Sequence, residues 1–306
     1  MDTPVIEVQG LTKAFGRQLA VENLSFEVGP GRVTGFLGPN GAGKTTTLRM
    51  LLGLAAPTSG EARVWGRPYV EIESPSRRVG VMLDASSFHP RRSGRGHLRW
   101  MAAAAGIPTR RIDAVLATVD LTAAADRRVG EYSLGMRQRL GLAAALLGDP
   151  ELLILDEPSN GLDPAGIRWL REWLRSFARR GGTVFVSSHQ LGEVDHMADE
   201  VVVIQAGGLV AHTSVQDLTA RRAAAVRVRS AEPERLAHLL RAAGADVRAG
   251  EGPALHVRGL RAEQVGAAAA GGGVVLHELV TQTQSLEDVF LELTEREHSH
   301  VGVVEG

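Results

Sequence analysis

The sequence contains no cysteine, and only two of its 34 basic residues are lysine, Lys13 and Lys44. The absence of cysteine excludes disulfide bonds and thiolate metal sites, and it suits a reducing compartment. A formal net charge of −1 over 306 residues leaves no global basic field that would attract nucleic acid. What remains is an ordinary globular composition, 44% hydrophobic and 23% charged, in a chain long enough for two domains.

Long apolar runs are also missing. The stretches at 140–147 and 152–155 are interrupted by Gly, Asp and Pro and are too short to cross a bilayer. The opening residues, MDTPVIEVQG, lack a basic region followed by an apolar one, so we expect no secretory signal. We therefore expect a cytoplasmic protein that reaches a membrane only through a partner.

A glycine-rich segment, GPNGAGKT at residues 38–45, follows the apolar run 33–37 and precedes a helical pattern over 45–54. This order predicts a strand, a tight turn and a helix, in which backbone N–H groups cradle phosphate oxygens. Lys44 is expected to neutralise the β and γ phosphates, and Thr45 to place its hydroxyl on Mg²⁺. A chain that otherwise uses arginine has a compact ammonium at this position, which favours phosphate binding.

A second motif, LLILDEP, places Asp156 at the carboxyl end of the buried strand 152–155. Ligands of open α/β sheets bind at that edge, so Asp156 can join the magnesium shell and Glu157 can polarise a water toward the γ-phosphate. Taken alone, two acids could simply cap a turn. Together with the glycine-rich loop they predict a nucleotide hydrolase.

Two further segments carry polar groups toward the same chemistry. In YSLGMRQR, residues 132–139, Ser133 and Gly135 can present a hydroxyl and N–H groups to a phosphate at a helix N-terminus. The alternative for this segment is a plain serine N-cap. His189 follows the strand 183–187, where residues reach the γ-phosphate, although a lone histidine there can also be structural.

The remaining pattern predicts two domains, 1–218 and 219–306. In the first, the segments 5–8 and 21–28 alternate like an antiparallel subsheet, 201–204 is a further strand and 165–180 a helix. The helical segments 110–119 and 136–147 frame an insertion at about 85–147. After residue 218 the order β-α-β-β-α-β suggests a small α+β, ferredoxin-like domain. Its arginines alternate with acids and lack aromatic neighbours, which favours a solvated face over RNA binding; they are Arg221, Arg222, Arg227, Arg229, Arg241, Arg248, Arg258 and Arg261.

The motif series, in this order over residues 4–218, resembles the ATP-binding subunit of ABC transporters. The C-terminal domain and SLEDVF at 285–290 resemble exporter subunits of the daunorubicin and bacitracin resistance type. The resemblance implies an α/β P-loop NTPase fold with antiparallel β and helical subdomains, and ATP and Mg²⁺ as cofactors. It identifies SNGLD at 159–163 as the D-loop, His189 as the switch histidine and Phe15 as the ring that stacks on adenine. The implied nucleotide-binding residues are Phe15, Gly38, Pro39, Asn40, Gly41, Ala42, Gly43, Lys44, Thr45, Thr46, Ser133 and Gly135.

Three features depart from the family pattern or extend it. Leu134 and Met136 stand where Gly and Gln are usual, and Asp84 stands where a glutamine normally contacts magnesium. Aspartate can still bind the metal, so the expected metal ligands are Thr45, Asp156 and Asp84. The basic segment 88–100 lies in a neighbourhood that faces the permease in this family. It is either a docking surface, through Arg91, Arg92 and Arg95, or a solvated helix start.

The resemblance implies a homodimer that sandwiches ATP between Lys44 and Thr45 of one copy and Ser133 and Gly135 of the other. Glu157 would act as general base and His189 would contact the γ-phosphate. Closure would drive export, including antibiotic efflux, through a separately encoded membrane permease. A translation factor of this class would join two cassettes, a DNA-associated one would need heptad arms or zinc-binding cysteines, and a non-hydrolysing regulator would lack the Asp156–Glu157 pair. An importer stays open, because the direction of transport rests on the resemblance alone.

Overall fold

The computed structural model describes residues 3–83, 88–190, 192, 194, 197–220, 224–250, 252 and 254–283. The chain divides into two units, Met1–Val215 and Gln216–Gly306, and the described residues of each are compact. Helix α8, Val215–Ala220, straddles the division between them. Within the described residues, no helix is both long and apolar enough to cross a membrane.

A six-stranded sheet forms the centre of the first unit, in the order β5-β6-β7-β3-β8-β9. Neighbouring strands within this sheet run parallel, except that β8 and β9 are antiparallel to each other. Every residue of β3, β6 and β7 is buried, which agrees with the largely apolar sequences of these strands. The strands are β3 Val33–Leu37, β5 Val79–Met82, β6 Leu152–Leu155, β7 Thr183–Ser188, β8 Glu200–Gln205 and β9 Gly208–Ser214.

A second, antiparallel sheet has the order β2-β1-β4, with β1 Ile6–Phe15, β2 Gln18–Val28 and β4 Ser59–Val64. The predicted pairing of the first two segments is confirmed, with Ile6 opposite Val28. The two sheets share one core, in which the rings of Phe26, Phe36 and Phe185 lie 5.2 to 5.6 Å apart. The glycine-rich segment that follows Phe36 is therefore held by a strand whose aromatic ring packs against both sheets.

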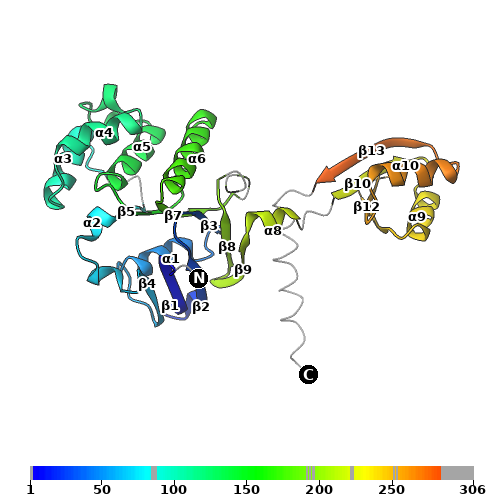
Figure 1. Cartoon of the computed structure of the whole chain (residues 1–306), viewed down its shortest axis with the longest axis horizontal. Helices are drawn as coiled ribbons and strands as arrows, with labels where there is room; N and C mark the ends of the chain where they lie inside the picture. The colour runs from blue at the N-terminus through cyan, green and yellow to red at the C-terminus, as the bar shows by residue number, and fades with distance from the viewer. Residues whose placement is uncertain are drawn as a thin grey trace. The chain divides into compact units, whose positions relative to one another are not determined.

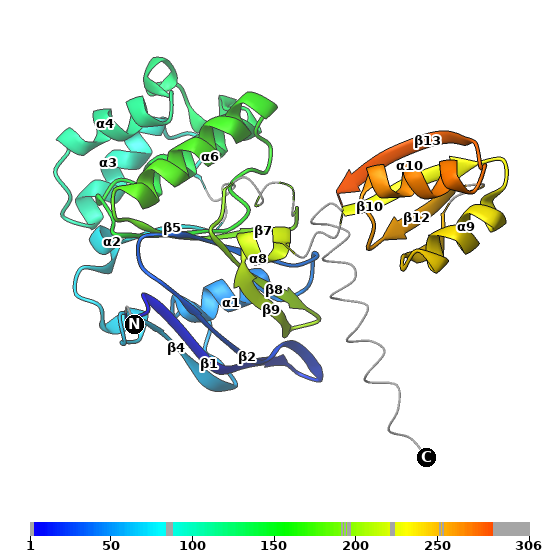
Figure 2. The same cartoon turned by 45° about the vertical axis from the view of Figure 1, so that its right-hand side comes forward.

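Three helices of the first unit, α3, α4 and α5, form one group. Figures 1 and 2 show α3, α4 and α5 on one side of the central sheet and the antiparallel sheet on the other. This α3–α5 group is the predicted helical subdomain. The helix after the glycine-rich loop ends three residues earlier than predicted, because Gly53 has a left-handed φ of 68°. The helices are α1 Lys44–Leu51, α2 Pro75–Arg78, α3 Gly94–Ala104, α4 Arg110–Thr118, α5 Leu134–Ala145 and α6 Pro164–Arg179, with short 3-10 turns at Tyr69–Glu71, Thr122–Ala124 and Val129–Glu131.

The second unit has its own apolar core and an antiparallel sheet in the order β11-β12-β10-β13. Strands β10 and β13 pair along their length, with Ala224 opposite Thr283. Its elements follow the order β-α-β-β-α-β, which favours the ferredoxin-like classification; that classification stays a prediction. The elements are β10 Ala224–Ser230, α9 Pro233–Ala242, β11 Asp246–Ala249, β12 Ala254–Arg258, α10 Ala262–Gly271 and β13 Leu276–Thr283.

Candidate active site

The glycine-rich loop joins β3 to α1 and is shaped by close backbone contacts. A Cβ on Gly38 would lie 2.5 Å from the carbonyl oxygen of Ile204, and one on Gly43 would lie 2.4 Å from that of Ala20. Gly43 also has a φ of 103°, which L side chains rarely adopt. The loop borders a cavity of about 200 Å³ lined by Ala20, Pro39, Asn40, Gly41, Gly43, Lys44, Thr45, Thr46 and Glu157.

Lys44 lies at the centre of this loop, with only 6% of its surface exposed. Its ammonium donates hydrogen bonds to the carbonyls of Gly38 (2.6 Å) and Pro39 (3.3 Å) and lies 3.3 Å from Oε1 of Glu157. The next residue, Thr45, donates its hydroxyl to Oδ2 of Asp156 at 2.6 Å. Two motifs more than a hundred residues apart in the sequence are thus in direct contact.

Ser187, on the neighbouring strand β7, holds both acidic residues. Its hydroxyl donates a hydrogen bond to Oδ1 of Asp156 and accepts one from the backbone N–H of Glu157 at 3.0 Å. The sequence interpretation did not identify Ser187. The available sign was a hydroxyl within the fully buried strand TVFVSS, where a polar side chain needs a partner.

Glu157 has a left-handed backbone, with φ of 48°, which is strained for a residue other than glycine. Oε2 of its carboxylate lies 2.8 Å from Nδ1 of His189, and Nε2 of that histidine lies 3.3 Å from the amide nitrogen of Gln190. Since a carboxylate only accepts, Nδ1 of His189 carries the proton and Nε2 accepts from Gln190. The predicted base and the predicted switch histidine are therefore in contact.

Ser133 and Gly135 lie at a different cavity. The Ser133 hydroxyl accepts a hydrogen bond from the N–H of Met136 at 3.2 Å and so caps α5. Gly135 packs against the D-loop, because a Cβ there would lie 3.0 Å from the carbonyl oxygen of Gly161. Their cavity, about 630 Å³, is lined by residues 120, 121, 123, 124, 133–136, 139 and 161–163 and shares no residue with the cavity beside Lys44. Within one chain, the two predicted halves of the nucleotide site therefore line separate cavities.

Phe15 ends strand β1 and is 57% exposed, with the ammonium of Lys13 at 5.1 Å from its ring centroid. Strand β1 pairs with β2, and Ala20 of β2 lines the cavity beside Lys44. The hairpin that carries Phe15 therefore borders this cavity. The predicted metal ligand Asp84 lies outside the described residues, as does the segment 285–290.

The predicted docking arginines differ in their surroundings. Arg95 forms ion pairs with Asp113 and, at 3.2 Å, with Asp126, so its charge is already paired within the helical subdomain. The guanidinium of Arg92 instead lies 5.1 Å from the ring centroid of Trp100, which is 57% exposed on α3.

His97 supports the same surface from below. It is buried against Phe88, and burial, with a smaller contribution from the charge of Arg92, lowers the pKa of His97. The His97 ring beneath Arg92 and Trp100 is therefore neutral at physiological pH.

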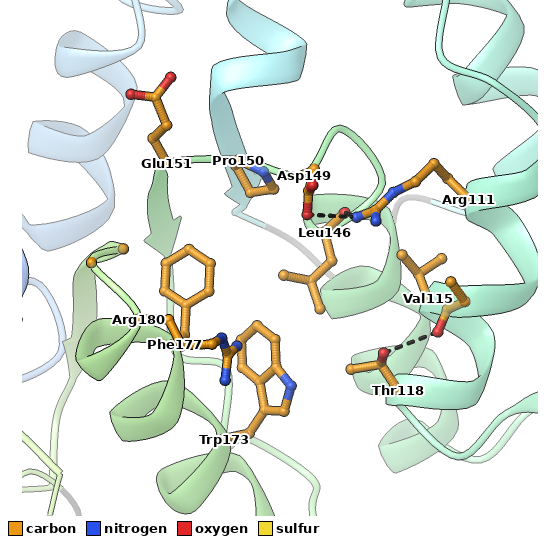
Figure 3. Close-up of a pocket in the computed structure, with 13 residues that line it drawn as sticks. Arg111, Val115, Thr118, Leu146, Asp149, Pro150, Glu151, Trp173, Phe177 and Arg180 are labelled. Atoms are coloured by element: carbon orange, nitrogen blue, oxygen red, sulfur yellow. Dashed lines mark hydrogen bonds and ion pairs between the residues drawn. The ribbon is translucent and has the colours of Figure 1, made fainter.

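A further cavity of about 520 Å³ lies between α4, α6 and the segment that leads into β6 (Figure 3). Trp173 and Phe177 stack on one wall, and Arg111 pairs with Asp149 across from them. Glu151 and Gly182, which also line it, precede β6 and β7. This cavity is therefore at the amino ends of the strands, opposite the edge that carries Asp156 and His189.

Replacing Ser187 with alanine is expected to destabilise the site and weaken magnesium-dependent nucleotide binding. The change leaves the buried N–H of Glu157 without its partner and removes a donor from Asp156, a loss of about 1–3 kcal/mol. Chemical denaturation with and without Mg-nucleotide measures both effects. Thr183→Val is the matched control, since it removes a hydroxyl that accepts from Gly31 at the other end of β7. Equal nucleotide affinity in the two variants would contradict the role of Ser187.

Comparison with known proteins agrees with this geometry. A family model described as "ABC transporter" matches residues 21–160, and a second, described as a domain of unknown function, matches residues 224–287. The bacitracin transport ATP-binding protein of Bacillus licheniformis is 45% identical over 209 residues, covering 67% of this chain and 68% of the relative. The Nod factor export ATP-binding protein I of Rhizobium sp. (strain N33) is 35% identical over 304 residues, covering 97% and 99%.

Solved structures show the same fold. The ATP-binding subunit of an ABC transporter superposes with a TM-score of 0.64 at 27% identity, covering 71% of this chain and 92% of that one. A nucleotide-free ATP-binding cassette, 19% identical, gives a TM-score of 0.62 over 69% of this chain and 92% of that one.

Proposed function

Because this chain belongs to the ATP-binding subunits of ABC transporters and is an ATPase, we propose that it powers an exporter. Two copies would close on Mg-ATP and drive a separately encoded membrane permease. The single observation that carries this proposal is the network of Lys44, Thr45, Asp156, Glu157 and His189 at one edge of the sheet.

The residues present fit a magnesium triphosphate. The Lys44 ammonium and the loop that glycine alone can form supply the phosphate cradle. The Thr45 hydroxyl and the Asp156 carboxylate are the oxygen ligands that magnesium prefers, and they already touch one another. When bound, the ion neutralises charge on the phosphates.

Glu157 would remove a proton from the attacking water. Oε2 is held by His189, whereas the buried Oε1 has no hydrogen-bond donor among the described residues and lies 3.3 Å from the Lys44 ammonium. As water attacks the γ-phosphorus, its proton passes to Oε1 and the bond to the leaving ADP oxygen breaks. His189 keeps the carboxylate oriented through this step.

Dimerisation is proposed from the separation of the two cavities. Within one chain, Ser133 and Gly135 line a different cavity from the one beside Lys44, and the two cavities share no lining residue. A second copy, turned to face the first, would bring each pair onto the nucleotide of the other. The hydroxyl that caps α5 would then also face a phosphate.

Export, rather than import, is proposed from the relatives. The relative that matches nearly the full chain is named for Nod factor export, and others are named for bacitracin and lantibiotic transport. A permease partner would place this chain at the cytoplasmic face of the membrane. An ATPase acting in translation or on DNA has no counterpart among these relatives.

The exposed pair of Arg92 and Trp100 is the proposed permease contact. Trp100→Ala is expected to lower co-purification with the permease by about 30-fold, the effect of losing an aromatic anchor worth ~2 kcal/mol. Leu54→Ala, another exposed apolar side chain (67%), is the matched control. The readouts are capture by a tagged permease encoded beside this gene and ATP-dependent efflux from vesicles. No association of the unmodified chain with that permease, or uptake instead of efflux, would overturn the exporter assignment.

A further inference from the structure

Helix α5 makes two contacts one turn apart that face different sites. At its start, Ser133 and Gly135 border the cavity shared with the D-loop. One turn later, the amide nitrogen of Gln138 donates a 2.9 Å hydrogen bond to the backbone carbonyl of Glu157. Gln138 is only 5% exposed, so this bond is sheltered from water. A single rigid helix therefore links the surface offered to a partner with the base of its own chain.

The backbone of Glu157 depends on such contacts. Its φ of 48° lies in the left-handed region, a conformation that persists only when the surroundings enforce it. Ser187 fixes its N–H, while its carbonyl accepts from Gln138 and, at 3.2 Å, from the N–H of Asn160. Of these three, Gln138 alone comes from the helical subdomain.

We propose that Gln138 is a positioning residue. Through its bond to the Glu157 carbonyl, the position of α5 determines whether the Glu157 carboxylate is oriented for proton transfer. The inference rests on the proposed ATP-sandwich homodimer. When the start of α5 engages the nucleotide of the partner copy, the helix carries Gln138 with it and fixes the Glu157 carbonyl. Occupancy of one site thereby controls the base of the other, and hydrolysis becomes cooperative in ATP.

Gln138→Met tests this role, because it keeps the length and volume of the side chain and removes the donor. The expected result is Mg-ATP affinity within about twofold of the unmodified chain and a kcat lowered roughly 10- to 100-fold, the scale of a misplaced catalytic group. The dependence of rate on ATP concentration loses its cooperativity.

Tyr132→Phe is the matched control for Gln138→Met. It removes another hydrogen bond of the helical subdomain, from the tyrosine hydroxyl to the carbonyl of Ala124 at 2.7 Å, and within the described part of the chain Tyr132 makes no hydrogen bond to Glu157. Loss of cooperativity in Gln138→Met only is expected. An equal loss in both variants, or none in Gln138→Met, overturns the proposal.

The Gln138→Glu variant provides a second test, the pH dependence of its rate, which a purely structural role of Gln138 would not change. A neutral carboxylic acid can donate to the Glu157 carbonyl, whereas a carboxylate cannot, and burial raises the pKa of such an acid. The rate of this variant, relative to the unmodified chain, is expected to rise as the pH falls from about 8 to about 6. A ratio that stays constant or falls overturns the inference.

The same experiments separate the two levels of the hypothesis. An unmodified chain that hydrolyses ATP cooperatively, beside a Gln138→Met variant that does the same, overturns the positioning role and leaves the exporter ATPase intact. An unmodified chain that never dimerises with Mg-ATP overturns the sandwich and the positioning role together.

Discussion

Replacing Glu157 with glutamine is expected to lower kcat by roughly 10²- to 10⁴-fold, the contribution of a positioned general base, while Mg-ATP stays bound. The amide keeps the shape of the side chain but cannot take the proton of the attacking water. Removing the negative charge also frees Lys44, now 3.3 Å from Oε1, to interact with phosphate alone. Bound nucleotide should therefore accumulate in a closed dimer, which size-exclusion chromatography with Mg-ATP and single-turnover assays detect.

Glu151→Gln is the matched control for that experiment. Glu151 precedes β6, just as Glu157 follows it, and its exposed carboxylate pairs with Arg78 far from the phosphates. The same chemical change there should leave turnover within about twofold, as for other surface ion pairs. Normal turnover in Glu157→Gln would remove this residue from the role of base and return the search to other groups near His189.

Lys44→Ala is expected to weaken Mg-ATP binding by at least about 30-fold, because it removes a buried cation worth ~2 kcal/mol or more to a charged partner. It also leaves the Glu157 carboxylate at the cavity without its nearest cation, which adds repulsion toward the triphosphate. Isothermal titration calorimetry with Mg-ATP measures the change. Lys44→Arg should also weaken Mg-ATP binding, since a guanidinium fork is wider than the ammonium that lies 2.6 Å from the Gly38 carbonyl.

Lys13→Ala provides the comparison, because Lys13 is the second lysine and donates to the carbonyl of Ala56 instead. Its loss should change the affinity far less than the loss of Lys44. If Lys44→Ala binds as tightly as the unmodified chain, the glycine-rich loop does not hold the triphosphate and the mechanism derived from it is wrong.

The glycine-rich loop and the strand that ends just before Asp156 could be predicted because their information is local. Glycine positions, a lysine and a run of apolar residues lie within a few residues of each other, so the sequence alone reveals the strand, turn and helix. Alternation and length likewise predicted the β-α-β-β-α-β order of elements in the second unit. The ends of helices and strands are harder to predict: α1 ends before its predicted C-terminus because of the left-handed backbone of Gly53.

The residues that hold the acids could not be predicted in the same way. Ser187 is 31 residues from Asp156, and Gln138 is 19 residues from Glu157, so neither contact has a local pattern. Each arises only once the parallel strands and α5 are packed together. Strand β4 was also missed, because its first three residues are exposed and it pairs only with β1. Long-range hydrogen bonds and edge strands depend on tertiary structure that no short segment encodes.

In the second unit, β10 and β13 are neighbours, and their outer ends meet where Ala224 faces Thr283. The backbone therefore enters and leaves this four-stranded sheet at neighbouring positions, with Cα atoms about 5 Å apart as in any antiparallel pair. A sheet whose first and last residues lie side by side can be exchanged between relatives as one continuous segment. Grafting experiments that swap residues 224–283 between relatives have, in this geometry, a natural pair of cutting sites.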